Sequence, residues 1–146
     1  MSRYIKNRRG NKQRIPGDLI YNGQKKVALP FVNLIQFNEE TFNEQRVEDI
    51  HAMESLVDKE CVNWFDVNGV HDGDLLRSIG TQFNLHTLTL EDIINTGGRA
   101  KVATFDDYTS VLLKMMRIEE SDNRVHSEQL TCIIGDHIVI TFQERK

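Results

Sequence analysis

The feature that most limits the fold is a series of four apolar segments in the C-terminal third of the chain, separated by short polar breaks. The segments span residues 101–105, 108–118, 125–134 and 137–142. The breaks carry Asp106-Asp107, Ser121-Asp122-Asn123 and Gly135-Asp136. Breaks this short join neighbouring antiparallel strands, and the last of them is a two-residue hairpin signature. The pattern therefore predicts a C-terminal antiparallel meander.

The first half of the chain alternates between strand and helix patterns. Apolar runs predict strands at residues 28–37, 41–47 and 62–67. Apolar residues at helical spacing predict helices at residues 48–57 and 72–83, the second capped by Asp72 or Asp74. A mixed first half followed by a meander predicts an α/β fold, with one mixed sheet sandwiched between helices in an α/β/α arrangement.

Basic residues are concentrated at the N-terminus of a chain that is otherwise acidic. Residues 1–26 contain eight Lys and Arg against Asp18 alone, a formal charge of +7, and the remaining residues carry −11. With 39% hydrophobic and 27% charged residues over 146 positions, the composition is that of one globular domain. We therefore expect residues 1–26 to form a flexible basic tail and residues 27–146 to form the folded domain.

The basic tail raises the alternative of nucleic-acid binding. Its first half carries Arg3, Lys6, Arg8, Arg9, Lys12 and Arg14. Such residues neutralise phosphates and give an affinity that falls with salt. Only Tyr4 and Tyr21 offer rings for base stacking, so a solvated tail, or one near an anionic membrane surface, is favoured and no nucleic-acid partner is expected.

Several functional classes lack support in the sequence. No apolar stretch approaches the roughly 18 residues that a transmembrane helix needs. Cys61 and Cys132 lie far apart without C-x-x-C spacing, which predicts buried reduced thiols and a cytoplasmic location. Phosphate-binding loops and nucleophile motifs are also absent, so we do not expect an enzyme.

A short helix pattern at residues 87–94 carries the strongest candidate site. Leu90, Ile93 and Ile94 recur at helical spacing and predict a buried stripe, with Thr87 or Thr89 as the N-cap. The neighbouring acids of this helix are therefore expected to point outward.

Those acids are Glu91 and Asp92, which we predict to be metal ligands. Successive helical residues are about 100° apart, so the two carboxylates diverge and cannot complete a metal site alone. Mg²⁺ keeps several waters and takes only one or two carboxylates, which suits such a pair. The alternative is structural, because acids in a first helical turn stabilise the positive end of the macrodipole by about 0.3–1 kcal/mol each.

Residues 61–146 carry a series of short motifs in a fixed order. They are Trp64-Phe65-Asp66-Val67-Asn68-Gly69-Val70, Leu90-Glu91-Asp92-Ile93, Lys101-Val102, Ser127-Glu128-Gln129 and Val139-Ile140-Thr141-Phe142-Gln143-Glu144. In this order the motifs resemble the cytoplasmic N-terminal domain of the CorA family of magnesium and cobalt transporters. Thr87, Gly97-Gly98 and Ala100 depart from the family pattern, which loosens the helix start and the turn after it but removes no acid.

The resemblance implies a divalent-ion sensor within a homopentameric channel. In the family, ions bound between neighbouring cytoplasmic domains hold the pore shut, and Glu91 and Asp92 match the positions that supply one half of that site. The resemblance also implies weak binding of Mg²⁺ or Co²⁺, an α/β/α regulatory domain, and a stalk helix and transmembrane pore that would follow Lys146. On this interpretation the protein lies in the inner (plasma) membrane, with this domain on the cytoplasmic side.

Two other metal interpretations are weighed against this one. A related transporter that handles Zn²⁺ stays open, although the absence of clustered His and Cys residues counts against a soft-metal site. The acidic cluster at Asp66, His71, Asp72 and Asp74 is predicted to be structural, because Asp72 and Asp74 lie where a helix begins.

Overall fold

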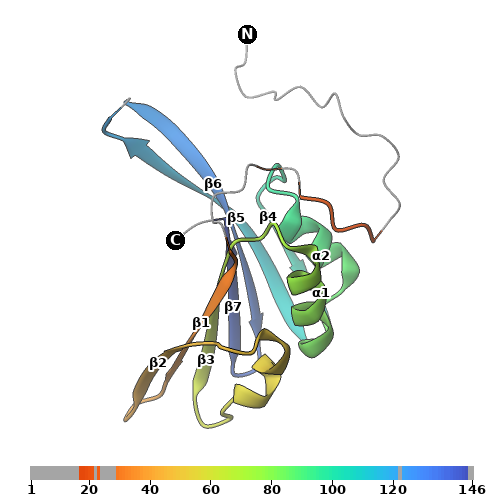
Figure 1. Cartoon of the computed structure of the whole chain (residues 1–146), viewed down its shortest axis with the longest axis vertical. Helices are drawn as coiled ribbons and strands as arrows, with labels where there is room; N and C mark the ends of the chain where they lie inside the picture. The colour runs from red at the N-terminus through yellow and green to blue at the C-terminus, as the bar shows by residue number, and fades with distance from the viewer. Residues whose placement is uncertain (1–16, 22, 24–28, 122, 145–146) are drawn as a thin grey trace.

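The computed structural model describes residues 17–21, 23, 29–121 and 123–144, and its centre is one seven-stranded sheet (Figure 1). The strands lie in the order β2-β1-β3-β7-β6-β5-β4. Neighbours are antiparallel except β3 and β7, which are parallel. The strands are β1 (Phe31–Phe37), β2 (Phe42–Arg46), β3 (Val62–Asn68), β4 (Lys101–Thr104), β5 (Tyr108–Glu119), β6 (Arg124–Gly135) and β7 (Ile138–Gln143).

The C-terminal half of the sheet is the antiparallel meander that the turn signals predict. β4 pairs with β5, β5 with β6, and β6 with β7. Asn123 and His137, which lie in the two tight turns, have φ values of 50° and 57°, in the left-handed region that such turns use. Beyond the sheet, β5 and β6 continue as a two-stranded ribbon (upper left in Figure 1).

Three short helices accompany the sheet. They are η1 (Ile50–Leu56), α1 (Gly73–Gln82) and α2 (Thr87–Ile94). The predicted helix at residues 48–57 is instead a 3₁₀ segment, which non-helical backbone angles at Ala52 interrupt. The cap prediction for α1 is confirmed, since the Asp72 carboxylate accepts the N–H groups of Asp74 and Leu75.

The core lies on one face of the sheet. Leu34, Phe65 and Ile140 stand side by side on neighbouring strands and are fully buried. They pack with the inward stripes of the three helices into a single apolar cluster. Its members include Val32, Leu34, Phe65, Val67, Ile140 and Phe142 from the strands and Met53, Leu76, Ile79, Leu90, Ile93 and Ile94 from the helices.

The predicted α/β/α sandwich is wrong for the described residues. The three helices form one layer, in which α1 contacts both η1 and α2. The opposite face of the sheet carries Trp64, Leu113 and Ile134, which are all exposed. Counting helices along a sequence does not say which face of a sheet each one covers, and here the described helices share one face, as Figure 1 shows.

The predicted basic tail at residues 1–26 lies largely outside the described residues. Its described part, residues 17–21 and 23, is in contact with the domain, and Leu19 and Tyr21 pack against the core. This part of the tail therefore contributes to the surface around the helices.

Candidate metal centre on helix α2

Helix α2 is fixed to the rest of the domain by its buried stripe. Leu90, Ile93 and Ile94 are buried, as their spacing predicts. Leu90 packs closely on Gly80 of α1, where an added Cβ would lie 2.7 Å from the Leu90 Cδ1 atom. A glycine at position 80 therefore lets the two helices approach and sets the position of α2.

The N-cap of α2 is a residue that the sequence pattern did not indicate. His86 caps the helix, and its Nδ1 atom accepts the N–H of Leu88 at 3.1 Å. The prediction of Thr87 or Thr89 is wrong, because Thr87 is already helical and the buried Thr89 hydroxyl pairs with the Tyr108 hydroxyl at 2.7 Å. A His ring that accepts at Nδ1 carries its proton on Nε2 when neutral.

The two predicted metal ligands lie in the second half of this helix. Glu91 and Asp92 are its fifth and sixth residues, and the first turn contains no acid. The macrodipole explanation is therefore wrong, because a negative charge near the C-terminal end of a helix is unfavourable. The two carboxylates need another source of stabilisation, and each has one.

Glu91 receives a hydrogen bond from the N-terminal part of the chain. The backbone N–H of Gly17 donates to Glu91 Oε1 at 2.7 Å, across 74 positions of sequence. This is a short, charge-assisted contact. The Glu91 side chain is half-buried and is not the freely outward-pointing acid that the helix pattern alone suggests.

Asp92 forms an ion pair with the first residue of β4. Lys101 Nζ lies 2.6 Å from Asp92 Oδ2, and the side chains are 50% and 29% exposed respectively. Water screens a pair of this exposure, which is worth about 0–1 kcal/mol. Lys101 therefore neutralises the charge of Asp92 but holds its side chain only weakly.

The C-terminal end of α2 is held from below by the sheet. The buried Gln129 amide donates to the Asp92 carbonyl at 2.8 Å, and Lys114 Nζ donates to the Thr96 carbonyl at 2.7 Å. Lys114 also donates to Gln129 Oε1 at 3.2 Å. Backbone carbonyls that would otherwise be unpaired at a helix end are thus satisfied, and a cation lies at the negative pole.

These contacts bring together residues that the sequence analysis named and residues that it missed. Glu91 and Asp92 are consecutive residues of α2 with different partners, and Gly17, Lys101 and Gln129 were not recognised as those partners. Lys101 and Gln129 belong to motifs that support the family resemblance, but the motifs alone do not show that these residues contact α2.

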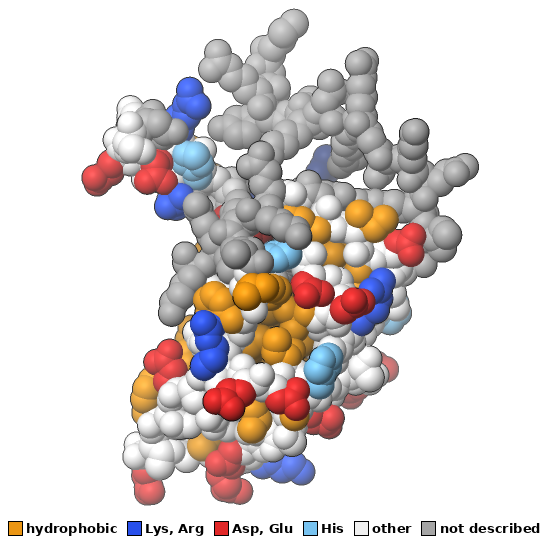
Figure 2. All heavy atoms as spheres, viewed as in Figure 1, with side chains coloured by type: hydrophobic (Ala, Val, Ile, Leu, Met, Phe, Trp, Pro, Cys, Tyr) orange, Lys and Arg blue, Asp and Glu red, His pale blue; other side chains and the backbone are white. Residues whose placement is uncertain are grey.

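The donor chemistry of the pair suits a hard cation. Carboxylate oxygens are the ligands that Mg²⁺ prefers, and one or two of them together with waters suffice. Among the residues that the structure describes, no group of three or more His, Cys, Asp or Glu side chains is placed to hold a metal. On the face shown in Figure 2, the acidic side chains are scattered rather than gathered. Glu91 and Asp92 thus fit part of a hard-cation site, which waters or another chain must complete.

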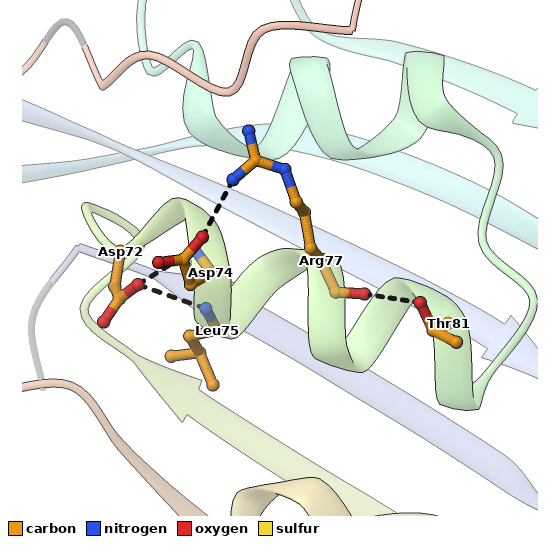
Figure 3. Close-up of polar contacts among 5 residues, drawn as sticks. All are labelled: Asp72, Asp74, Leu75, Arg77 and Thr81. Carbon is orange, nitrogen blue, oxygen red and sulfur yellow. Dashed lines mark hydrogen bonds and ion pairs between the residues drawn. The ribbon is translucent and has the colours of Figure 1, made fainter.

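The second acidic cluster is structural, as predicted. Asp72 caps α1, and Asp74 pairs with Arg77 at 3.0 Å on the same helix (Figure 3). Asp66 lies on the opposite side of the sheet region and accepts hydrogen bonds from Asn68 and Thr141. Their carboxylates are used separately and do not converge.

Besides the carboxylate pair, the described residues include two free cysteines and two open grooves beside α1. Cys61 is buried and Cys132 is partly exposed. Burial raises the pKa of the Cys132 thiol, which therefore stays protonated at neutral pH. Both grooves have Leu19 and Arg77 in their linings, and one is also lined by His71 and by Asp72 and Asp74, the acids that begin α1.

Comparison with known proteins decides the family. The model of the CorA-like Mg²⁺ transporter protein family matches residues 59–146, which is more than half of the chain. This chain belongs to the CorA-like Mg²⁺ transporter family. The match includes Glu91, Asp92, Lys101 and Gln129, so the resemblance seen in the sequence motifs is confirmed.

A CorA relative matches this chain in sequence, and two solved structures share its fold. The cobalt/magnesium transport protein CorA of Thermotoga maritima is 30% identical over 130 residues, covering 89% of this chain and 37% of that protein. The full-length CmaX protein matches with a TM-score of 0.61 at 11% identity, over 80% of this chain and 36% of CmaX. The soluble domain of CorA from Methanocaldococcus jannaschii matches with a TM-score of 0.54 at 14% identity, over 77% and 41%.

This chain thus spans a little over a third of the CorA relative that it matches in sequence. The members of the family that it resembles are transporters rather than enzymes. Within the described ranges, none of the helices is both long and apolar enough to span a membrane.

Proposed function

We propose that this chain forms the cytoplasmic, cation-sensing part of a CorA-type Mg²⁺ or Co²⁺ transporter that assembles as a homopentamer in the inner (plasma) membrane. The observation that carries the proposal is the half-buried carboxylate pair on α2, which lies within the segment matched by the CorA family. The pair does not stabilise its own helix, because it lies at the unfavourable end of the macrodipole.

Glu91 and Asp92 would hold the cation on this subunit, and a neighbouring subunit and waters would complete its shell. A bound divalent cation would supply the positive charge that lets carboxylates of two subunits face each other. Without such a charge, facing carboxylates repel, at about 1 kcal/mol per pair at 4 Å in water and more where water is excluded. Binding therefore favours the assembled state by its differential affinity for that state.

In the proposed mechanism, the ion pair with Lys101 determines how tightly Asp92 binds the cation. To ligate through Oδ2, Asp92 must release the Lys101 ammonium, which lies 2.6 Å away. Because an exposed pair is worth no more than about 1 kcal/mol, the lysine weakens cation binding without preventing it. A weak site suits a sensor that must empty when the cation becomes scarce.

Asp92→Asn is expected to abolish cation binding at α2. The change keeps the shape of the side chain and removes the charge that attracts the cation. In amide NMR spectra, Mn²⁺ added as a paramagnetic substitute for Mg²⁺ should broaden signals around residues 91–92 in the wild type and not in the variant. Asp74→Asn is the matched control, since Asp74 is an exposed acid of α1 with its own basic partner. Equal broadening in the wild type and in Asp92→Asn would contradict the site.

Lys101→Met is expected to tighten Mn²⁺ binding by up to about fivefold. The substitution keeps an extended apolar side chain but removes the internal cation that competes for Asp92, and about 1 kcal/mol corresponds to roughly a fivefold change in Kd. Arg77→Met is the matched control, because it removes the partner of Asp74 on the other helix. A Kd that is unchanged or weaker in Lys101→Met would show that Lys101 does not compete with the cation.

A further inference from the structure

A short segment that we call the strap, residues 17–21, lies beside the carboxylate pair and contacts both helix α2 and the residue that follows strand β7. At one end, the Gly17 N–H binds Glu91 Oε1 at 2.7 Å. At the other end, the Tyr21 hydroxyl donates to Glu144 Oε1 at 2.9 Å, just past strand β7. Between these contacts, Leu19 packs against the core and lines both grooves beside α1.

The backbone of the strap is suited to this position. Gly17 has a φ of 97°, a conformation that glycine adopts readily and that other residues rarely adopt. The first residue of α1 is also a glycine, and an added Cβ on Gly73 would lie only 3.0 Å from the Leu19 carbonyl oxygen. Two glycines thus permit the strap to lie close against the helices.

The aromatic end of the strap is held by a second set of contacts. The Tyr21 ring lies edge-on to His71, with 6.1 Å between the ring centroids. Burial and the hydrogen bond to Glu144 raise the pKa of Tyr21, so its hydroxyl remains a donor throughout the neutral range. Tyr21 therefore holds the strap at a point that does not touch the carboxylate pair.

The strap occupies an oxygen atom that a cation would use. The Gly17 N–H takes up a lone pair of Glu91 Oε1, while Lys101 takes up Asp92 Oδ2, so each acid already has an internal partner. Each carboxylate oxygen has two lone pairs, so a cation displaces the internal partner where both need the same lone pair and otherwise shares the oxygen with it.

We propose that the strap is a built-in competitor of divalent cations at Glu91 and Asp92, so that cation binding releases the strap and strap docking weakens cation binding. The proposal rests on the proposed function, because it takes the α2 acids as the cation site. Linkage makes the effect reciprocal: strap docking weakens cation binding by the same factor by which a bound cation weakens strap docking.

Two strap variants in the full chain test the proposal, with Mn²⁺ as the probe. Gly17→Pro removes the donor N–H and cannot adopt a positive φ, and it should lower the apparent Kd for Mn²⁺ about three- to tenfold. Tyr21→Phe removes the hydrogen bond to Glu144 at the distant end of the strap and should shift the Kd in the same direction by a smaller factor. Gly10→Pro, the same substitution elsewhere in the basic sequence, is the control and should leave the Kd unchanged.

Amide NMR of the wild type supplies the second measurement. Added Mg²⁺ should move the signals of Leu19 and Ile20 toward the positions of an unstructured chain. Mn²⁺ binding with the same Kd in Gly17→Pro, or a Kd changed in Gly17→Pro but not in Tyr21→Phe, would overturn the strap proposal and leave the cation site standing. Failure of Mn²⁺ to broaden residues 91–92 in the wild type and in Gly17→Pro alike would overturn the proposed function itself.

Discussion

Replacing Phe65 with alanine is expected to lower the free energy of unfolding by about 3–5 kcal/mol. Phe65 is fully buried at the centre of the sheet, between Leu34 on β1 and Ile140 on β7, and its ring lies 5.4 Å from that of Phe83. Truncation removes apolar surface from the core and leaves a cavity that the surrounding strands cannot close. Urea denaturation followed by circular dichroism measures the loss.

Trp64→Ala is the control for this result, because Trp64 precedes Phe65 and points to the opposite face. Its side chain is 37% exposed and its indole N–H donates to the Thr141 hydroxyl at 2.9 Å. Losing one such hydrogen bond and part of an exposed ring is expected to cost about 1–2 kcal/mol. A loss as large as that of Phe65→Ala would show that both faces of the sheet are covered, which would contradict the two-layer description.

The strands could be predicted well because their signals are local. Alternating apolar residues and tight polar turns define β4 to β7, and these strands pair in sequence order. The parallel pairing of β3 with β7 could not be predicted in the same way. Phe65 lies beside Ile140, far along the chain, and this register is set by the packing of side chains from both strands.

The sequence pattern predicted the wrong arrangement of layers, with helices on both faces of the sheet. The resemblance to CorA and the alternation of helices and strands both suggested a sandwich. Strand residues alternate in burial along β1, where Val32 and Leu34 are fully buried and their neighbours are only partly buried. One covered face and one open face produce this alternation, whereas strands covered on both faces are apolar throughout.

The candidate site shows the same division between local and distant information. The buried stripe of α2 follows from the spacing of Leu90, Ile93 and Ile94, and the prediction of burial is confirmed. The contacts that determine the state of the acids come from distant segments. Gln129 is 37 positions from Asp92, and Gly17 is 74 positions from Glu91. The spacing of residues within α2 therefore does not predict these contacts.

The two acids of α2 lie between a buried contact and a half-exposed one. Gln129 is buried and holds the backbone of α2 from the sheet, so the helix itself is fixed. Lys101 is half-exposed and is held to Asp92 by an ion pair that water screens. The backbone of α2 is therefore fixed, while the carboxylates of Glu91 and Asp92 can exchange their partners. This arrangement suits the weak, reversible cation site proposed above.

Asn63→Leu is expected to destabilise the domain by about 3 kcal/mol or more, although it keeps the branching and the number of heavy atoms of the side chain. Asn63 is fully buried at the start of β3, and its Nδ2 atom donates to the carbonyls of Asp58, Cys61 and His137 at 2.7, 3.1 and 3.0 Å. Its Oδ1 atom accepts the Asp58 N–H at 2.9 Å and a Gln36 N–H at 2.8 Å. Leucine satisfies none of these groups, and a buried polar group without a partner costs about 1–3 kcal/mol.

Asn38→Leu is the matched control, because Asn38 also makes several hydrogen bonds but is exposed. Its Oδ1 atom accepts the N–H groups of Glu40 and Thr41 at 2.9 and 2.8 Å in the turn before β2. Water can replace those bonds, so the expected loss is about 1 kcal/mol or less. Similar losses for the two variants would mean that the Asn63 hydrogen bonds do not tie β3 to the start of β7. The side-chain network would then be a consequence of that parallel pairing and not one of its causes.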